Sequence, residues 1–312
     1  MSSAVLQQLP APLLAWYDTA RRSLPWREQV SPYRTWVSEI MLQQTRVSAV
    51  IPYFERFMAA LPTVEALAAA DESQLLALWQ GLGYYSRARN LQKAAKTIVN
   101  DLGGVFPDSY EELLKLTGVG EYTAGAIASI AFRRPVPAVD GNVLRVVARL
   151  TDCSDNILNE AVRRRFREEL QEIIPHDRSG DFNQGLMELG ALVCLPNTEP
   201  KCGECPCRHF CLACKGGHQT SLPVREKDKG KRKEEKTVFI LRRGEGEAVR
   251  QRPKEGLLAS LWEYPNVEGT LNEQEAAAQL STWGVSPHKW LKKAKKKHEI
   301  TCLVTPSFLR PV

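Results

Sequence analysis

The sequence predicts a mainly α-helical protein that is followed by a smaller α+β unit. Apolar residues recur at helical spacing from residue 6 to residue 210, and turns rich in glycine or proline interrupt that spacing. A charged segment then separates this region from a C-terminal part with a different pattern. With 312 residues, 43% of them hydrophobic, the chain is long enough to bury a sizeable core in two domains.

Charge and terminal composition narrow the class of protein. The chain has 42 Lys and Arg against 36 Asp and Glu, a net charge of +6 that suits a polyanionic partner without identifying one. Residues 1–16 lack the features of a signal peptide, and no apolar run is long enough to span a membrane. We therefore expect an intracellular protein that does not bind membranes, located in the cytoplasm or nucleoid if the source is bacterial.

Residues 1–215 are predicted to form one helical domain. No segment in it shows the alternation of a strand. Helical spacing is clearest in three groups of apolar residues: Trp36-Ile40-Val47-Ile51, Leu75-Leu78-Leu82 and Val143-Leu144-Val147-Leu150. Turns are predicted where glycine or proline interrupts the spacing: residues 81–83, 103–104, 107–109 and 118–120.

The C-terminal part is predicted to be a separate α+β domain. Residues 216–237 are polar and highly charged, which is typical of a linker. In the domain at 238–312, residues 238–241 indicate a strand, residues 257–265 indicate a turn and a strand, and residues 273–283 have the apolar spacing of a helix.

A cysteine cluster closes the helical region. Four of its cysteines have the spacing Cys-x7-Cys-x2-Cys-x5-Cys: Cys194, Cys202, Cys205 and Cys211. Four thiolates in a compact loop suit either zinc or an iron–sulfur cluster, and buried cysteines without a metal are the alternative. Two additional thiols, Cys207 and Cys214, leave the set of ligands uncertain by one position.

A glycine hairpin and an aspartate loop precede this cluster. Gly118 and Gly120 allow the backbone between two helices to approach a partner closely, and the amides that begin the next helix can bind a phosphate. A helix C-cap would also explain Gly118. Asp140 lies where a further helix begins, so it is also expected to be an N-cap.

Four motifs in this order resemble the adenine DNA glycosylase (MutY) family of the helix-hairpin-helix DNA glycosylase superfamily. They are Leu-Pro-Trp-Arg at 24–27, Ser-Glu-Ile-Met-Leu-Gln-Gln-Thr at 38–45, Gly-Leu-Gly-Tyr-Tyr-Ser-Arg-Ala-Arg at 81–89 and Val-Asp-Gly-Asn at 139–142. The resemblance covers residues 13–214. It implies a helix-hairpin-helix glycosylase fold and favours a [4Fe-4S] cluster over zinc, although the family usually has one residue fewer between the first two cysteines.

The family performs base-excision repair, so the resemblance implies a monomeric enzyme that removes adenine paired with 8-oxoguanine or guanine in duplex DNA. It assigns Glu39 as the acid that protonates adenine and Asp140 as the carboxylate that faces the cationic sugar, with Asn142 beside it. Taken alone, Glu39 could instead be solvated on one helix face with Gln43 and Arg46.

Tyr122 predicts that the reaction stops after the base has been removed. Relatives that also cleave the strand carry a nucleophilic Lys at the corresponding position, so Tyr122 implies a monofunctional glycosylase. An ordinary core tyrosine is the alternative for this residue. For the chain as a whole, the alternatives are a glycosylase-lyase of the endonuclease III type and a DNA-binding relative without catalysis.

The resemblance also implies residues that bind the flipped nucleotide. Gln44 would hold the vacated position open and Tyr84 would insert beside the opposing base, while Arg27 and Glu188 would line the adenine pocket. Without the resemblance, Tyr84 would be a packing aromatic, and Arg87 would belong to a solvated basic edge or contact a phosphate.

Residues 252–265 resemble the Nudix-like domain with which the family inspects the base opposite adenine. The family pattern stops near His298. We therefore expect a truncated domain, with a frameshift near His298 as the hypothesis, and a weakened preference for 8-oxoguanine over guanine.

Overall fold

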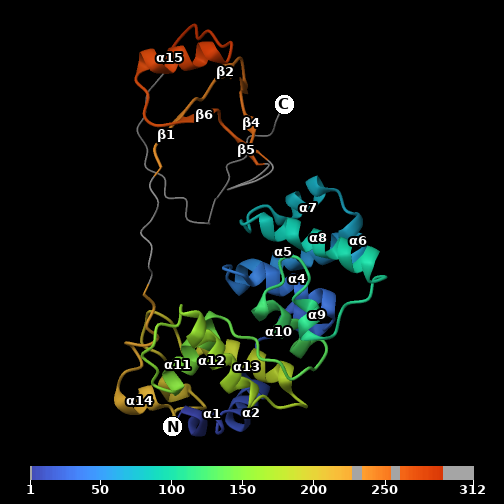
Figure 1. Cartoon of the computed structure of the whole chain (residues 1–312), viewed down its shortest axis with the longest axis vertical. Coiled ribbons are helices and arrows are strands. Elements are labelled where there is room, and N and C mark those ends of the chain that lie inside the picture. The colour runs from blue at the N-terminus through green and yellow to red at the C-terminus, as the bar shows by residue number, and fades with distance from the viewer. Residues whose placement is uncertain (1, 227–233, 254–260, 291–312) are drawn as a thin grey trace. The chain divides into compact units, whose positions relative to one another are not determined.

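The structure is a computed structural model that describes residues 2–226, 234–253 and 261–290. It divides into two compact units, one made of residues 1–82 and 87–228 and the other of residues 83–86 and 229–312. In the part of the chain that the structure describes, helices build the first unit, and short strands with one helix build the second (Figure 1). Across the described residues, no helix combines the length and the apolar character that crossing a membrane requires.

The first unit confirms the predicted mainly helical class. The predicted turns at 81–83, 103–104, 107–109 and 118–120 all lie between helices. The helices are α1 Ser2–Leu6, α2 Pro10–Ala20, α3 Pro25–Glu28, α4 Pro32–Leu42, α5 Val47–Ala60, α6 Val64–Ala69, α7 Glu72–Trp79, α8 Ser86–Asp101, α9 Tyr110–Leu113, α10 Glu121–Ile130, α11 Gly141–Leu150, α12 Glu160–Gln171, α13 Ser179–Leu192, the 3-10 helix η1 Cys202–Glu204 and α14 Leu212–Gly216.

Helices α10 and α13 connect two groups of helices in this unit. Helix α13 packs against α2, α10 and α11, and α10 packs against α4 and α9. Phe166 and Phe182 are fully buried in one group, and Trp36 and Phe54 in the other, each side chain contributing about 1.5–3 kcal/mol by its burial. This packing brings α4, α10, α11 and α13 together, although they are distant in sequence.

The helical spacing at residues 36–51 is interrupted between α4 and α5. Gln44 has a left-handed backbone with φ of 59°, which ends the helix. The Arg87 guanidinium donates hydrogen bonds to the carbonyl oxygens of Ile40 at 2.7 Å and Gln43 at 2.6 Å, groups that the end of a helix leaves without intrahelical partners. The interpretation of Arg87 as part of a solvated basic edge is therefore wrong.

The described residues of the second unit form three two-stranded antiparallel ladders and one helix. The ladders pair β1 Lys236–Val238 with β6 Asn266–Glu268, β2 Arg242–Arg243 with β3 Gly246–Glu247, and β4 Arg250–Gln251 with β5 Trp262–Glu263. Helix α15 spans Glu273–Thr282 and begins with a capping box, which confirms the helix predicted at 273–283.

The strand predicted at 238–241 is wrong in its position. Its ladder with β6 runs over residues 236–238. Phe239, which follows it, packs with Ala276 and Leu280 in the small core of this unit. The predicted change of pattern near His298 lies outside the described residues, and so does half of the Nudix-like motif, residues 254–260.

Asn183 of α13 fixes the segment that leads to Asp140. Its side chain is fully buried. Its Oδ1 accepts a hydrogen bond from the amide of Ala138 at 3.0 Å, and its Nδ2 donates to the carbonyl of Val136 and the hydroxyl of Ser129, both at 2.8 Å. One buried amide therefore sets the path of the chain before α11.

We predict that Asn183→Ala lowers the free energy of unfolding by about 2–4 kcal/mol, because it leaves buried backbone groups without partners. Gln171→Ala is the matched control, since the Gln171 side chain donates to the carbonyl of Pro135 in the same segment but at an exposed position. Its loss should stay within about 1 kcal/mol. Urea unfolding measures both, and equal losses would show that Asn183 has no special role.

Candidate active site and cysteine-lined cavity

Glu39 lies in a helix that is buried on all sides. Helix α4 is capped by Ser31, and its residues 35–41 are all buried. Glu39 itself is 5% exposed. The alternative in which Glu39 is solvated on a face with Gln43 and Arg46 is therefore wrong, because α4 packs against both α5 and α10 rather than lying on the surface.

Tyr122 of α10 holds the Glu39 carboxyl. The Tyr122 hydroxyl donates a hydrogen bond to Oε2 of Glu39. The pKa of Glu39 is raised to about 7, mainly by burial. The negative charge of Asp140 adds to this rise, and the hydrogen bond from Tyr122 partly opposes it. Burial and the charges of Glu39 and Asp140 raise the pKa of Tyr122 well above its usual value, so the phenol remains a donor.

Asp140 is the N-cap of α11, as predicted. Its Oδ1 accepts hydrogen bonds from the amides of Asn142 at 2.9 Å and Val143 at 2.8 Å, and its Oδ2 accepts one from Nδ2 of Asn142 at 2.8 Å. Burial raises the pKa of Asp140, whereas these three donors and the charge of Arg145 favour the carboxylate. Asp140 acts on Glu39 and Tyr122 electrostatically, so the structure brings the three residues into one site.

Arg145 connects the aspartate loop to the cysteine loop. Its guanidinium donates to Oδ1 of Asn142 at 2.9 Å, to the carbonyl of Gly190 at 2.8 Å and to the carbonyl of Cys194 at 2.8 Å. Gly190 permits this approach, because a Cβ there would lie 2.6 Å from the Cβ of Asn142. Sequence reasoning missed Arg145, although a buried charge on the apolar helix α11 was a usable signal.

Glu188 and Arg27 form a second buried charged group with Arg22. Glu188 accepts two hydrogen bonds from Arg22 and one from Arg27, each at 2.8 Å. Burial alone would raise the pKa of Glu188, but the hydrogen bonds of Arg22 and the charge of Arg27 outweigh it and lower that pKa. Arg27 in turn acts on Glu39 electrostatically. Arg22 was missed from the sequence because its partner is 166 positions away.

The glycine hairpin lies between α9 and α10. Gly118 has φ of 80°, and a Cβ there would lie 2.7 Å from the Cβ of Asn90. Since α9 already ends at Leu113, the alternative of a helix C-cap at Gly118 is wrong. Gly120 is the N-cap of α10, and nothing lies within 4 Å of where its Cβ would be. The space beside Gly120 at the start of α10 is therefore open.

Gln44 and Tyr84 share an unusual backbone conformation. Their φ values are 59° and 48°, in the left-handed region that residues other than glycine seldom adopt. Such conformations cost roughly 1–3 kcal/mol each and often occur at functional sites. Gln44 follows the end of α4, and Tyr84 belongs to the second unit.

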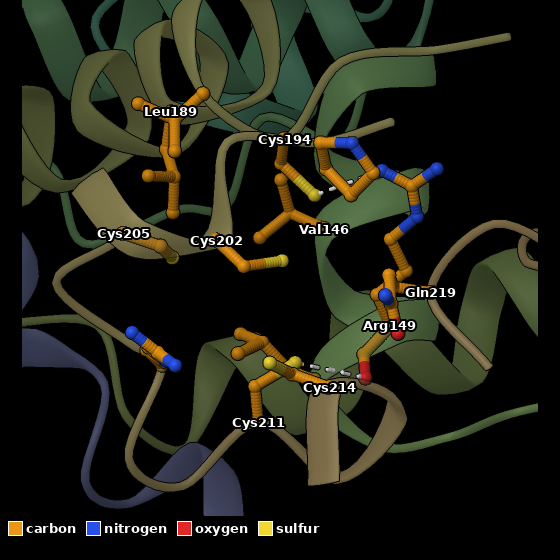
Figure 2. Close-up of a pocket in the computed structure, with 13 residues that line it drawn as sticks. Val146, Arg149, Leu189, Cys194, Cys202, Cys205, Cys211, Cys214 and Gln219 are labelled. Carbon is orange, nitrogen blue, oxygen red and sulfur yellow. Dashed lines mark hydrogen bonds between the residues drawn. The ribbon is translucent and has the colours of Figure 1, made fainter. Parts of the chain in front are cut away.

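Five cysteines line one cavity beside α11, η1 and α14 (Figure 2): Cys194, Cys202, Cys205, Cys211 and Cys214. Arg149 and Arg208 also line it. Within the described ranges, no three Cys, His, Asp or Glu side chains converge as closely as a single metal ion requires. Thiols spread around a cavity with two cationic neighbours fit an anionic cluster of several atoms.

Hydrogen bonds hold three of these thiols. Arg149 donates to Sγ of Cys194 at 3.2 Å, and the carbonyl of Arg149 accepts from Sγ of Cys211 at 3.4 Å. A hydrogen bond from Cys207 lowers the pKa of Cys205, which favours the thiolate that binds metals. Cys207 itself is fully buried.

Residues 37–172 match the HhH-GPD superfamily of base excision DNA repair proteins. The chain is 39% identical to the adenine DNA glycosylase of Arabidopsis thaliana, covering 87% of this chain and 49% of that protein. It is 37% identical to the adenine DNA glycosylase of Homo sapiens, covering 84% of this chain and 58% of that protein. It is 33% identical to the adenine DNA glycosylase of Buchnera aphidicola subsp. Schizaphis graminum, covering 96% of this chain and 82% of that protein. The chain thus spans less than two thirds of the plant and human relatives.

Two solved structures are also similar. A thermostable thymine-DNA glycosylase superposes with a TM-score of 0.61 and 28% identity, covering 69% of this chain and 97% of that one. Endonuclease III in a trapped covalent intermediate with DNA superposes with a TM-score of 0.60 and 25% identity, covering 70% of this chain and 99% of that one.

We predict opposite effects of removing the charge from the two buried glutamates. The pKa of Glu39 rises from 4.5 to about 7 on folding. Protonated Glu39 therefore stabilises the folded state fully below pH 4.5, and this contribution of up to about 3 kcal/mol is lost as the pH rises to 7. Glu39→Gln should therefore be more stable than the wild type at pH 8.

Glu188→Gln should be less stable than the wild type at pH 7 by about 3 kcal/mol, because Arg22 and Arg27 lose a buried partner.

Urea unfolding at pH 5 and pH 8 measures both variants. The wild type and Glu39→Gln should differ in the slope of stability with pH between these values. If Glu39→Gln is no more stable than the wild type at pH 8, Glu39 is not a buried acid with a raised pKa.

Proposed function

The chain belongs to the adenine DNA glycosylase family, and we propose that it hydrolyses the N-glycosidic bond of adenine paired with 8-oxoguanine or guanine in duplex DNA. One observation carries this proposal. A buried glutamate with a pKa of about 7 lies within electrostatic reach of an aspartate whose carboxylate accepts three hydrogen bonds. One carboxyl group can therefore give a proton while the other remains an anion.

In the proposed reaction, Glu39 protonates a ring nitrogen of adenine. Protonation allows the base to take the electron pair of the glycosidic bond and leave as a neutral molecule, and such acid catalysis contributes about 10²–10⁴-fold. The Tyr122 hydroxyl keeps the Glu39 carboxyl in place. Arg27, which Glu188 and Gln184 hold, lines the adenine pocket.

Bond cleavage leaves positive charge on the deoxyribose. The Asp140 carboxylate, which Asn142 orients, stabilises that charge until a water molecule adds to the sugar carbon. The proton that the water releases restores the acid. This division of work between two carboxyl groups corresponds to that of other glycoside hydrolases.

The proposed activity ends with base removal. Cleavage of the strand through a Schiff base requires an amine, and Tyr122 provides a phenol at the position after the hairpin. Its hydroxyl is used as a donor to Glu39. The product is therefore an intact strand with an abasic site.

DNA binding in this proposal uses the hairpin and the two residues with left-handed backbones. The amides at the start of α10 after Gly118 and Gly120 bind a phosphate, Gln44 fills the position that the flipped adenine leaves, and Tyr84 inserts beside the opposing base. A single chain acts on the duplex. The left-handed conformations of Gln44 and Tyr84 support this assignment, because such backbone conformations are costly and often occur at functional sites.

The five-thiol cavity is proposed to hold a [4Fe-4S] cluster. The four cysteines of the Cys-x7-Cys-x2-Cys-x5-Cys motif would bind it: Cys194, Cys202, Cys205 and Cys211. When bound, the cluster supplies a rigid covalent core to a loop with few apolar residues. Arg149 and Arg208 would balance its negative charge.

Single-turnover incubation with a duplex that contains one A·8-oxoguanine pair tests the function. Strand breaks that appear only after hot alkali support monofunctional adenine excision. Breaks without alkali would indicate a glycosylase-lyase, and intact strands under both treatments would indicate a DNA-binding relative without catalysis.

We predict that Glu39→Gln binds this duplex with wild-type affinity and excises adenine at least about 10²-fold more slowly. Glu65→Gln is the control, because Glu65 is an exposed glutamate of the same unit and its substitution should leave the rate unchanged. Fluorescence anisotropy measures binding and single-turnover kinetics measure excision. Excision by Glu39→Gln at the wild-type rate would refute the assignment of the acid.

A further inference from the structure

Met187 lies beside the pair of side chains formed by Glu39 and Tyr122. Its thioether Sδ is 3.6 Å from the Tyr122 hydroxyl oxygen, the same oxygen that is bonded to Oε2 of Glu39. Across the residues that the structure describes, these two groups are the hydrogen-bonding neighbours of that hydroxyl. The proposed reaction uses Glu39 and Tyr122 and gives Met187 no part.

Helix α13 fixes the position of Met187. Phe182, Leu186 and Leu189 of this helix are fully buried, and the helix packs against α10, which carries Tyr122. Met187 itself is half-buried. The contact between the thioether and the phenol therefore joins two packed helices rather than a helix and a loop.

The Tyr122 hydroxyl has one hydrogen and donates it to one acceptor at a time. When Glu39 is ionised, its carboxylate is the stronger acceptor and takes this hydrogen bond. When Glu39 carries a proton on Oε2, its own O–H donates to the Tyr122 oxygen, and the phenol hydrogen then needs another acceptor. A thioether sulfur is a weak acceptor, and that of Met187 is within reach.

Few charges act on this group of side chains. Burial is the largest influence on the pKa of Glu39 and of Tyr122, and Asp140 raises both pKa values further, whereas Arg27 lowers that of Glu39. On α13 and on the helices packed against α4, the remaining charged side chains are exposed or held by arginine: Glu28, Glu55, Arg56, Glu121, Asp181 and Glu188. Because its pKa is about 7, Glu39 changes its charge near neutral pH.

We propose that Met187 is a positioning residue of the acid: the Tyr122 hydroxyl donates to its thioether when Glu39 is protonated and to Glu39 when Glu39 is ionised. This inference rests on the proposed role of Glu39. The phenol keeps its hydrogen throughout and only turns its O–H bond, while Glu39 takes up its proton from water. Every hydrogen of the Glu39–Tyr122 pair then has an acceptor in the acid form, which stabilises that form.

Met187→Leu tests the proposal, because leucine has a similar volume and no acceptor. The variant loses a hydrogen bond that exists only while Glu39 is protonated, so urea unfolding should show a larger loss of stability at pH 5 than at pH 8. Met58→Leu is the matched control, since Met58 is a buried methionine of α5 and its loss should be the same at both pH values. Equal losses at pH 5 and pH 8 for Met187→Leu would overturn the proposal.

NMR gives a second measurement that leaves Met187 in place. The chain has four methionines, so carbon-13 labelling of their methyl groups gives few signals. The Met187 signal should shift with a midpoint near pH 7 in the wild type and stay constant in Tyr122→Phe. A shift that persists in Tyr122→Phe would show that Met187 only senses the charge of Glu39 through space, and it would overturn the turning hydroxyl.

Adenine excision gives a third measurement. In Met187→Leu the rate should begin to fall at a pH about 0.5 lower than in the wild type, which makes it about threefold lower at pH 8. An unchanged pH profile would contradict the role of Met187. If the wild type excises no adenine at any pH, the proposed function fails, but the unfolding and NMR measurements need no activity and still decide the role of Met187.

Discussion

The candidate site depends on keeping the Glu39 carboxyl away from water. A glutamate in solvent is ionised at neutral pH and cannot protonate a base. Helix α4 prevents this because its residues 35–41 are buried on all sides by neighbouring helices. The packing of α10 against α4 has a second effect, since it places the Tyr122 hydroxyl on the carboxyl. Core packing and acid strength are therefore one property of this fold.

Arginines that are buried or half-buried compensate the other charges of the helical unit. Arg22 and Arg27 neutralise Glu188, and Arg145 connects the loop of Asp140 to the carbonyl of Cys194. Glu39 differs, because the group bonded to it is a phenol rather than a guanidinium. A cation at that position would lower the pKa of Glu39 and keep it ionised. The distribution of arginines thus separates a structural carboxylate from an acid.

Local patterns predicted the helices, the turns and the cap at Asp140, because helix spacing, glycine and N-caps are properties of neighbouring residues. They failed where distant contacts decide. Nothing near Glu39 in the sequence shows that α4 is buried all round, and the partners of Arg87 and Glu188 are more than forty residues away. The strand near residue 238 was misplaced because its ladder partner, residues 266–268, lies about thirty residues later in the chain.

The two carboxyl groups meet different surroundings because of where each lies in its helix. At the N-cap of α11, Asp140 meets backbone amides that have no intrahelical partner, and the positive end of the helix dipole favours an anion. Glu39 lies inside α4, where the helix already uses its own amides. Burial there brings the desolvation cost without those donors, so it favours the protonated form. The same element that stabilises a carboxylate at its start can therefore favour an acid in its interior.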